Sequence, residues 1–112
     1  MKTTYPIISA DSHITEAPET YVDFIDPSMR DRAPKIVNGG DKVGDMFEVE
    51  GMRPISLGLV AAAGKPASEI RILGERFEDL HRSGWDPNYR VADQERDGVS
   101  AEVIYPTVHG AV

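Results

Sequence analysis

The sequence predicts an α/β fold built on a parallel sheet, and three observations support this prediction. An apolar run at residues 5–10 is typical of a buried strand, and capping residues predict a helix at 87–97. A second apolar run at 99–105, interrupted by Ser100 and Glu102, follows that helix directly. A strand, a long excursion, a helix and a second strand are the opening of a parallel α/β architecture.

The first predicted strand is followed by interrupted helical patterns. Residues 5–10 have β-branched Ile7 and Ile8 at their centre, as expected for a buried strand. Over residues 16–32 apolar side chains recur at three- and four-residue spacings, and Asp26 precedes a proline that can begin a second short turn. We therefore expect short helical pieces after the strand.

Residues 34–54 predict a β-hairpin inserted after the first strand. Apolar side chains at 35–37 and 46–50 flank a polar stretch at 38–41, whose Asn and Gly residues suit a tight turn. The glycines and alanines of residues 55–66 indicate a loop with one helical turn.

Two further helices are predicted before the second strand. Apolar residues at helical spacing favour a helix over 69–82, although Gly74 weakens that pattern. The helix at 87–97 is better defined, because Asp86 can cap it, a proline occupies its first position, and Gly98 suits a left-handed C-terminal residue.

Composition excludes several classes of function. The net charge of −7 argues against binding to the phosphate backbone of nucleic acids. We also expect no membrane association, since no stretch approaches the ~20 apolar residues that a spanning helix needs. Without a recognisable signal peptide, the cytoplasm is the expected compartment. The chain has no cysteine, so any metal would be held by Asp, Glu or His.

Asp11 and His13 are the most specific candidates for a functional site. They stand two residues apart at the end of the first predicted strand, and residues at this spacing in a strand point to the same face. A carboxylate and an imidazole side by side are suitable ligands for zinc or manganese. The alternative is that Asp11 only caps the following turn.

Three sequence blocks are similar to a known enzyme family. Residues 8–16 read ISADSHITE, residues 84–99 read GWDPNYRVADQERDGV, and residues 101–107 read AEVIYPT. In this order they resemble the amidohydrolase-related proteins of the aminocarboxymuconate-semialdehyde decarboxylase type. The resemblance covers both ends of the chain, and the hairpin region between them fits more loosely.

The resemblance implies the N-terminal portion of a (β/α)₈ TIM barrel with an inserted β-hairpin. The barrel would be incomplete, because a whole one needs about 250 residues. In this family the positions of Asp11 and His13 hold the first pair of metal ligands, and later strands supply further histidines and an aspartate that serves as general base. The expected cofactor is a divalent metal, zinc above all, with manganese as the alternative.

The resemblance also implies the reaction. We expect a metal-activated water to attack an amide, lactone or similar bond of a small-molecule substrate. Two alternatives stay open: non-oxidative decarboxylation on the same scaffold, and a catalytically inert remnant or binding module. The full-length protein is expected to be a homo-oligomer. The 112-residue chain by itself is expected to be inactive and to aggregate, dimerise or remain partly unfolded, because parallel strands normally need cover on both faces.

Tyr105 and Thr107, at the carboxyl end of the second predicted strand, are the candidate substrate-binding residues. The alternative for Tyr105 is packing against the inserted hairpin. His81 and His109 lie outside the expected site, His81 as a surface or loop residue.

Overall fold

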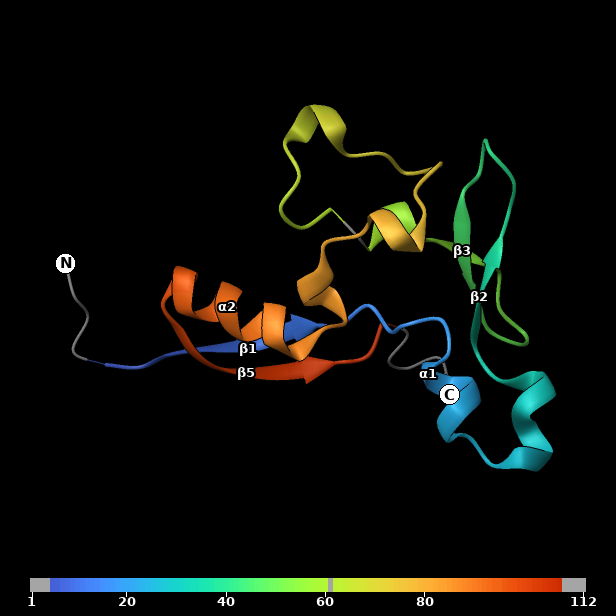
Figure 1. The fold of residues 1–112 in the computed structure, drawn as a ribbon, viewed down its shortest axis with the longest axis horizontal. Coiled ribbons are helices and arrows are strands. Elements are labelled where there is room, and N and C mark those ends of the chain that lie inside the picture. The colour runs from blue at the N-terminus through green and yellow to red at the C-terminus, as the bar shows by residue number, and fades with distance from the viewer. Residues whose placement is uncertain (1–4, 61, 108–112) are drawn as a thin grey trace. The chain divides into compact units, whose positions relative to one another are not determined.

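The computed structural model describes residues 5–60 and 62–107, which form a mixed α/β structure (Figure 1). One sheet is a parallel pair of strands and the other is antiparallel with three strands; the described residues form no closed barrel. No helix in these ranges is long and apolar enough to cross a membrane. The helices and strands are β1 (Ile7–His13), α1 (Thr20–Phe24), β2 (Lys35–Asn38), β3 (Asp45–Glu48), β4 (Ile55–Ser56), α2 (Pro87–Asp97) and β5 (Val99–Tyr105).

The chain divides into two compact units. Unit 1 combines the segment up to Glu16 with the segment from Arg82 onward, and unit 2 comprises Ala17–His81. Unit 1 therefore contains β1, α2 and β5, whereas unit 2 contains α1 and the antiparallel sheet. Each unit is described by itself below.

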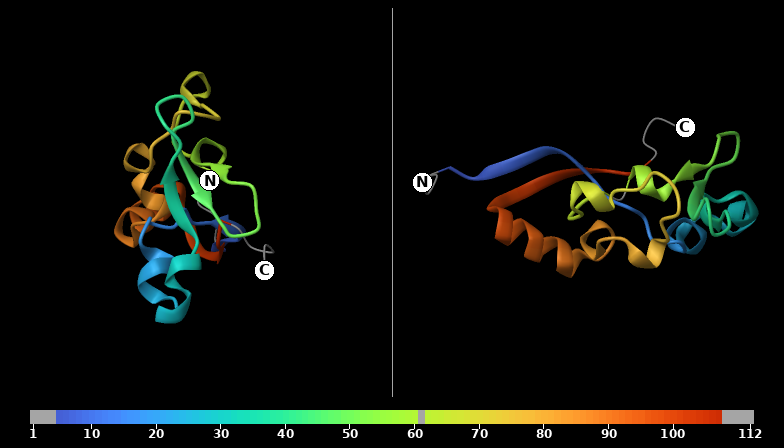
Figure 2. Two further views of the ribbon diagram at one scale, coloured as in Figure 1. Left: turned by 90° about the vertical axis from the view of Figure 1, so that its right-hand side faces the viewer. Right: turned by 90° about the horizontal axis from the view of Figure 1, so that it is seen from above.

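In unit 1, α2 packs along the parallel β1–β5 sheet (Figure 1, Figure 2). The helix has the bounds expected from the sequence because both ends are fixed locally. The carboxylate of Asp86 accepts a hydrogen bond of 3.0 Å from the backbone N–H of Asn88, and Gly98 adopts φ 74° at the C-terminal end. The chain then enters β5 directly, which places β5 beside β1.

β1 extends further than the sequence predicted. It ends at His13, not at residue 10, because pairing with β5 continues to the partners His13 and Tyr105. The register shifts between Ser9 and Ser12, so that β1 has one residue more than β5 over this stretch. Asp11 and His13 thus lie in the last three residues of β1, in agreement with their predicted place at the end of the first strand.

The prediction that β1 is a buried strand is wrong for the described part of unit 1. Ile8 is 61% exposed, and most of the strand is exposed with it. Side chains alternate along a strand, and register partners in a parallel sheet share a face. Since Glu102 contacts α2, Val103 and Tyr105 lie on the opposite face, as does Ile8 through its pairing with Ala101. In the described part of unit 1 no helix covers that face.

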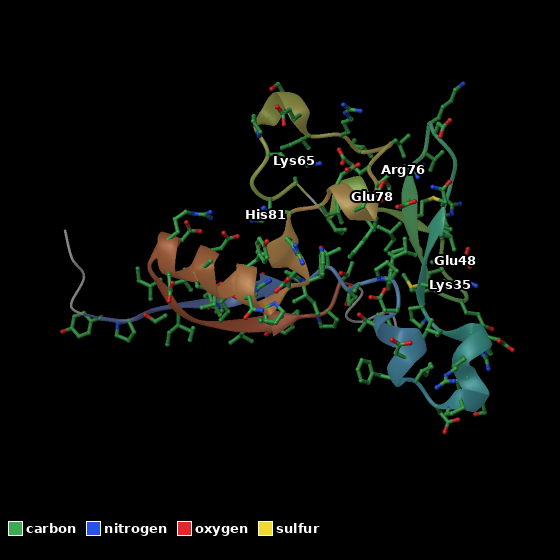
Figure 3. All side chains as sticks on the ribbon, viewed as in Figure 1. Lys35, Glu48, Lys65, Arg76, Glu78 and His81 are labelled. Carbon is green, nitrogen blue, oxygen red and sulfur yellow. The ribbon has the colours of Figure 1, made fainter. Side chains whose placement is uncertain are left out.

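Unit 2 contains the predicted hairpin, extended by one strand. β2 pairs antiparallel with β3, and Lys35 lies opposite Glu48 with Nζ and Oε1 3.8 Å apart (Figure 3). β4 adds a third strand within the segment predicted as a loop. The ring of Tyr21 in α1 lies 6.1 Å from that of Phe47. Among its described residues this unit has four buried apolar ones: Ala33, Phe47, Leu57 and Leu80.

The helix expected over residues 69–82 is wrong. The segment is irregular apart from short 3₁₀ turns, because several of its backbone groups bond to the hairpin and do not form consecutive helical hydrogen bonds. Gly74 N–H donates to the carbonyl of Val43 at 2.9 Å, and the Asp45 N–H donates to the carbonyl of Glu75 at 2.8 Å. The Asp45 carboxylate also accepts from the N–H of Phe77. The 3₁₀ helices found in the described residues span Pro27–Arg32, Leu57–Leu59, Ala67–Glu69, Phe77–Asp79 and Arg82–Gly84.

Gly44 and Gly51 offer a test of this packing in unit 2. Both have positive φ, 76° and 81°, which costs an alanine about 1 kcal/mol. A Cβ at residue 44 would overlap the carbonyl oxygen of Glu75, whereas one at residue 51 would meet no atom within 4 Å. We expect Gly44→Ala to lower the free energy of unfolding by about 3 kcal/mol and Gly51→Ala by about 1 kcal/mol, measured by urea denaturation. Equal losses would contradict the close approach of the irregular segment to the hairpin.

Candidate functional site

Asp11 and His13 lie together at the carboxyl end of β1. His13 Nε2 donates a hydrogen bond of 3.0 Å to Asp11 Oδ1, so the two side chains share a face of the strand, as their spacing predicted. The side chain of Asp11 is 81% exposed and that of His13 is 46% exposed. The pair is therefore accessible to a small ion from solvent.

Tyr105 lies beside His13, whereas the side chain of Thr107 turns to the backbone. The rings of His13 and Tyr105, which are register partners, have centroids 5.9 Å apart at an angle of 40°. The Thr107 hydroxyl donates to the carbonyl of Ile14 at 2.8 Å, and the Thr107 N–H donates to Oε1 of the buried Glu16 at 3.0 Å. Thr107 thus ties the chain after β5 to the chain after β1, and of the two residues Tyr105 is the one placed beside the candidate pair.

The Asp11–His13 pair fits a metal ion but supplies only two ligands. Zinc ligands at about 2.0–2.1 Å in a tetrahedral arrangement lie roughly 3.3 Å apart, close to the 3.0 Å between Asp11 Oδ1 and His13 Nε2. A small opening of the pair would let both atoms reach one ion. No group of three or more His, Cys, Asp or Glu side chains that could hold a metal occurs among residues 5–60 and 62–107.

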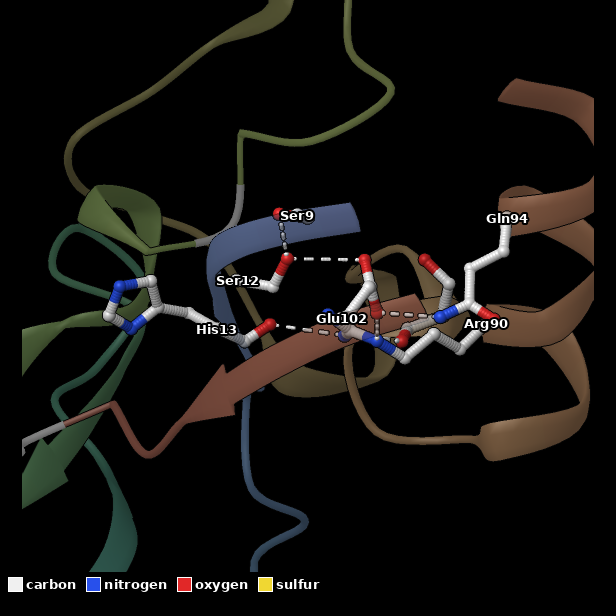
Figure 4. Close-up of polar contacts among 7 residues, drawn as sticks. Ser9, Ser12, His13, Arg90, Gln94 and Glu102 are labelled. Carbon is white, nitrogen blue, oxygen red and sulfur yellow. Dashed lines mark hydrogen bonds and ion pairs between the residues drawn. The ribbon is translucent and has the colours of Figure 1, made fainter. Parts of the chain in front are cut away.

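A polar network that was not predicted from the sequence lies on the other face of the β1–β5 sheet, between the sheet and α2 (Figure 4). Glu102 Oε2 accepts hydrogen bonds from Arg90 Nε at 2.6 Å and from Gln94 Nε2 at 2.9 Å. Its other oxygen accepts from the hydroxyl of Ser12 at 3.2 Å, which in turn contacts the hydroxyl of Ser9. The sequence does contain a signal for it, since residues 90 and 94 share a helix face and a lone carboxylate interrupts the strand that follows.

The Glu102 carboxylate is held ionised within this network. Burial raises the pKa of Glu102, but the hydrogen bonds that it accepts, above all the one from Arg90, and the positive charge of that guanidinium outweigh burial. The net result is a pKa below the usual range for a glutamate. Arg90 also donates from Nη1 to the carbonyl oxygens of His13 at 3.1 Å and Ser83 at 3.4 Å.

A shallow groove in unit 2 is separate from this chemistry. It has a volume of about 380 Å³, and it is lined by charged residues that include Arg32, Lys35, Glu48 and Glu50. Arg32 pairs with Glu50 and Lys35 with Glu48, so these charges compensate each other within the groove. The groove contains none of the residues predicted for the site.

Comparison with known proteins adds no family assignment. No protein-family model matches this chain, and no curated protein matches it significantly. The resemblance of the three sequence blocks therefore stays a prediction.

The lowered pKa of Glu102 predicts that the stability of the protein depends on pH. The stabilisation by the ionised Glu102 carboxylate is complete above the pKa of an unfolded-state glutamate, about 4.3, and is lost as the pH falls through the lower pKa of Glu102 in the folded state. Glu102→Gln should therefore lower the free energy of unfolding by about 2 kcal/mol at pH 7. Between pH 5 and pH 3 its melting temperature should fall less than that of the native protein. Thermal denaturation at these pH values measures both effects. The control is Glu95→Gln, an equal charge change at an exposed position of α2, which should keep the native pH profile. A Glu102→Gln profile parallel to the native one would contradict the assignment.

Proposed function

We propose that this chain is the N-terminal part of a metal-dependent hydrolase with a (β/α)₈ barrel, in which Asp11 and His13 are the first two metal ligands. The observation that carries the proposal is the convergence of the two side chains at the carboxyl end of a parallel strand, with ligand atoms 3.0 Å apart. Active sites of barrel enzymes lie at this end of the strands. The family resemblance of the three sequence blocks supports the same assignment of the pair.

The two faces of the β1–β5 sheet support the barrel part of the proposal. In a barrel the helices form the outer ring and the opposite face of the strands is packed inside. Here α2 contacts the face of Glu102, whereas Ile8, Val103 and Tyr105 lie on the other face and are exposed. His13 shares this second face through its pairing with Tyr105. Parallel sheets are normally covered on both sides, so further strands and helices would bury this face in the complete enzyme.

The residues of this chain would have distinct tasks in such a site. A divalent ion, when bound, supplies an activated water for attack on an amide, lactone or similar carbonyl. Asp11 and His13 would hold that ion, while the ring of Tyr105 beside His13 would line the side on which a small-molecule substrate enters. Catalytic zinc normally has three protein ligands, so the third ligand and the general base would come from other strands.

The metal ligands are tested by titration of the chain with zinc. We expect one weak zinc site in the native protein, measured by isothermal titration calorimetry at pH 7, since two ligands from one strand bind weakly. His13→Ala and the isosteric Asp11→Asn should each lower the affinity at least about tenfold. His81→Ala, which removes a histidine of unit 2, should leave the affinity unchanged. Unchanged zinc affinity in His13→Ala would remove this residue from the site.

The incomplete barrel is tested by self-association. The exposed apolar side chains of the face opposite α2 should cause the chain to associate as its concentration rises, measured by sedimentation velocity. The double variant Ile8→Thr, Val103→Thr should shift the protein toward monomer. Ile72→Thr is the control, because Ile72 is similarly exposed but lies in unit 2. A native chain that stays monomeric at high concentration and melts cooperatively would count against the incomplete barrel.

A further inference from the structure

Arg90 connects three segments of unit 1 through one guanidinium group (Figure 4). Its Nε donates to Glu102 in β5 at 2.6 Å, and its Nη1 donates to the carbonyl oxygen of His13 at the end of β1 at 3.1 Å. The same nitrogen lies 3.4 Å from the carbonyl oxygen of Ser83, which precedes α2. Because a guanidinium is planar and rigid, these contacts fix the relative positions of the three segments together.

The position of the Arg90 side chain is itself fixed by Glu102. Only 17% of the Arg90 side chain and 13% of the Glu102 side chain are exposed, so solvent screens this ion pair little. Glu102 is held in turn by hydrogen bonds from Gln94 of α2 and Ser12 of β1. The donor that reaches His13 therefore has little freedom to turn away.

The backbone around His13 is held on both sides of one peptide group. Its carbonyl oxygen accepts from Arg90, and the N–H of the same peptide, which belongs to Ile14, donates to the carbonyl oxygen of Tyr105 at 3.2 Å. The orientation of this peptide sets the direction of the Cα–Cβ bond of His13, and with it the approach of the imidazole to Asp11. A shift of a few tenths of an ångström here would change the 3.0 Å separation of the two candidate ligand atoms.

We propose that Arg90, held by Glu102, is a positioning residue for the Asp11–His13 pair. The contact to the His13 carbonyl fixes the strand end in the geometry in which both side chains meet one ion. This inference rests on the proposed metal-binding function and extends it to a residue of α2. Groups that orient metal ligands without touching the metal typically change metal affinity 10- to 100-fold when they are removed.

Two variants test the proposal. Arg90→Lys keeps the charge but lacks the planar fork, so it cannot hold Glu102 and the His13 carbonyl in the same way. The double variant Arg90→Met, Glu102→Met replaces the ion pair by apolar side chains, an exchange that proteins often tolerate without loss of stability, while the donor to His13 is removed. Arg82→Lys is the matched control, because Arg82 is exposed and stacks on the ring of Tyr89 at 4.7 Å.

Zinc affinity at pH 7, compared among folded variants by calorimetry, is the first measurement. We expect zinc to bind about tenfold more weakly to Arg90→Lys and to the double methionine variant, and as in the native protein to Arg82→Lys. Circular dichroism and thermal melting establish which variants are folded. A folded Arg90→Lys or double variant with native zinc affinity would overturn the proposal, whatever its stability.

A second measurement on the metal-free protein separates this proposal from the proposed function. Nuclear Overhauser contacts between the rings of His13 and Tyr105 report the orientation of the imidazole without metal. If the native chain binds no zinc, the proposed function fails, and these contacts decide the role of Arg90. Loss of the contacts in the Arg90 variants, with retention in Arg82→Lys, would support positioning. Contacts retained in all variants would overturn it.

Discussion

Unit 1 depends on the carboxylate of Glu102, because the helix and both strands meet there. Most α/β proteins join a helix to a sheet through apolar side chains, but here the contact includes an ion pair, an amide and two hydroxyl groups. A largely buried ion pair gives little net stability over an apolar contact, yet removing one partner is destabilising, because the other charge is then left without its counter-charge. The contact between α2 and the sheet therefore depends on hydrogen bonds with a fixed geometry, and each group in the network needs its partners to stay satisfied.

The two units are stabilised in different ways. All four buried apolar residues of the described chain belong to unit 2, among them Phe47 in β3 and Leu57 directly after β4. In unit 1 the exposed Ile8 and Val103 lie on the face that α2 does not cover, and His13 shares that face. The face with exposed apolar side chains is therefore also the face with the candidate metal ligand His13. Under the proposed function, the strands that bury this face would also supply the missing metal ligands.

The sequence predicted those features that local interactions determine. The caps at Asp86 and Gly98 are set by neighbouring residues, so α2 was found with its bounds, and the spacing of Asp11 and His13 was sufficient to bring their side chains together. Features that depend on distant partners were not found. The segment at 69–82 has helical spacing, but its backbone bonds to residues 43 and 45, about 30 positions earlier in the chain. The hydrogen bond from Arg90 to the carbonyl oxygen of His13 also spans 77 positions, and no local sequence pattern predicts it.

The register shift between Ser9 and Ser12 determines which chemistry each side of β1 carries. These serines are an odd number of residues apart, yet both reach the network around Glu102, and this is possible only because β1 contains one extra residue there. This extra residue also turns the side chain of Asp11 to the face opposite the Glu102 carboxylate. With regular alternation from Ser9 and no such irregularity, Asp11 would lie on the side of Glu102, placing two carboxylates together, and Ser12 would point to the other side. The pairing of β1 with β5, and not the order of side chains in β1 alone, therefore decides which groups reach the network and which reach the candidate ligand pair.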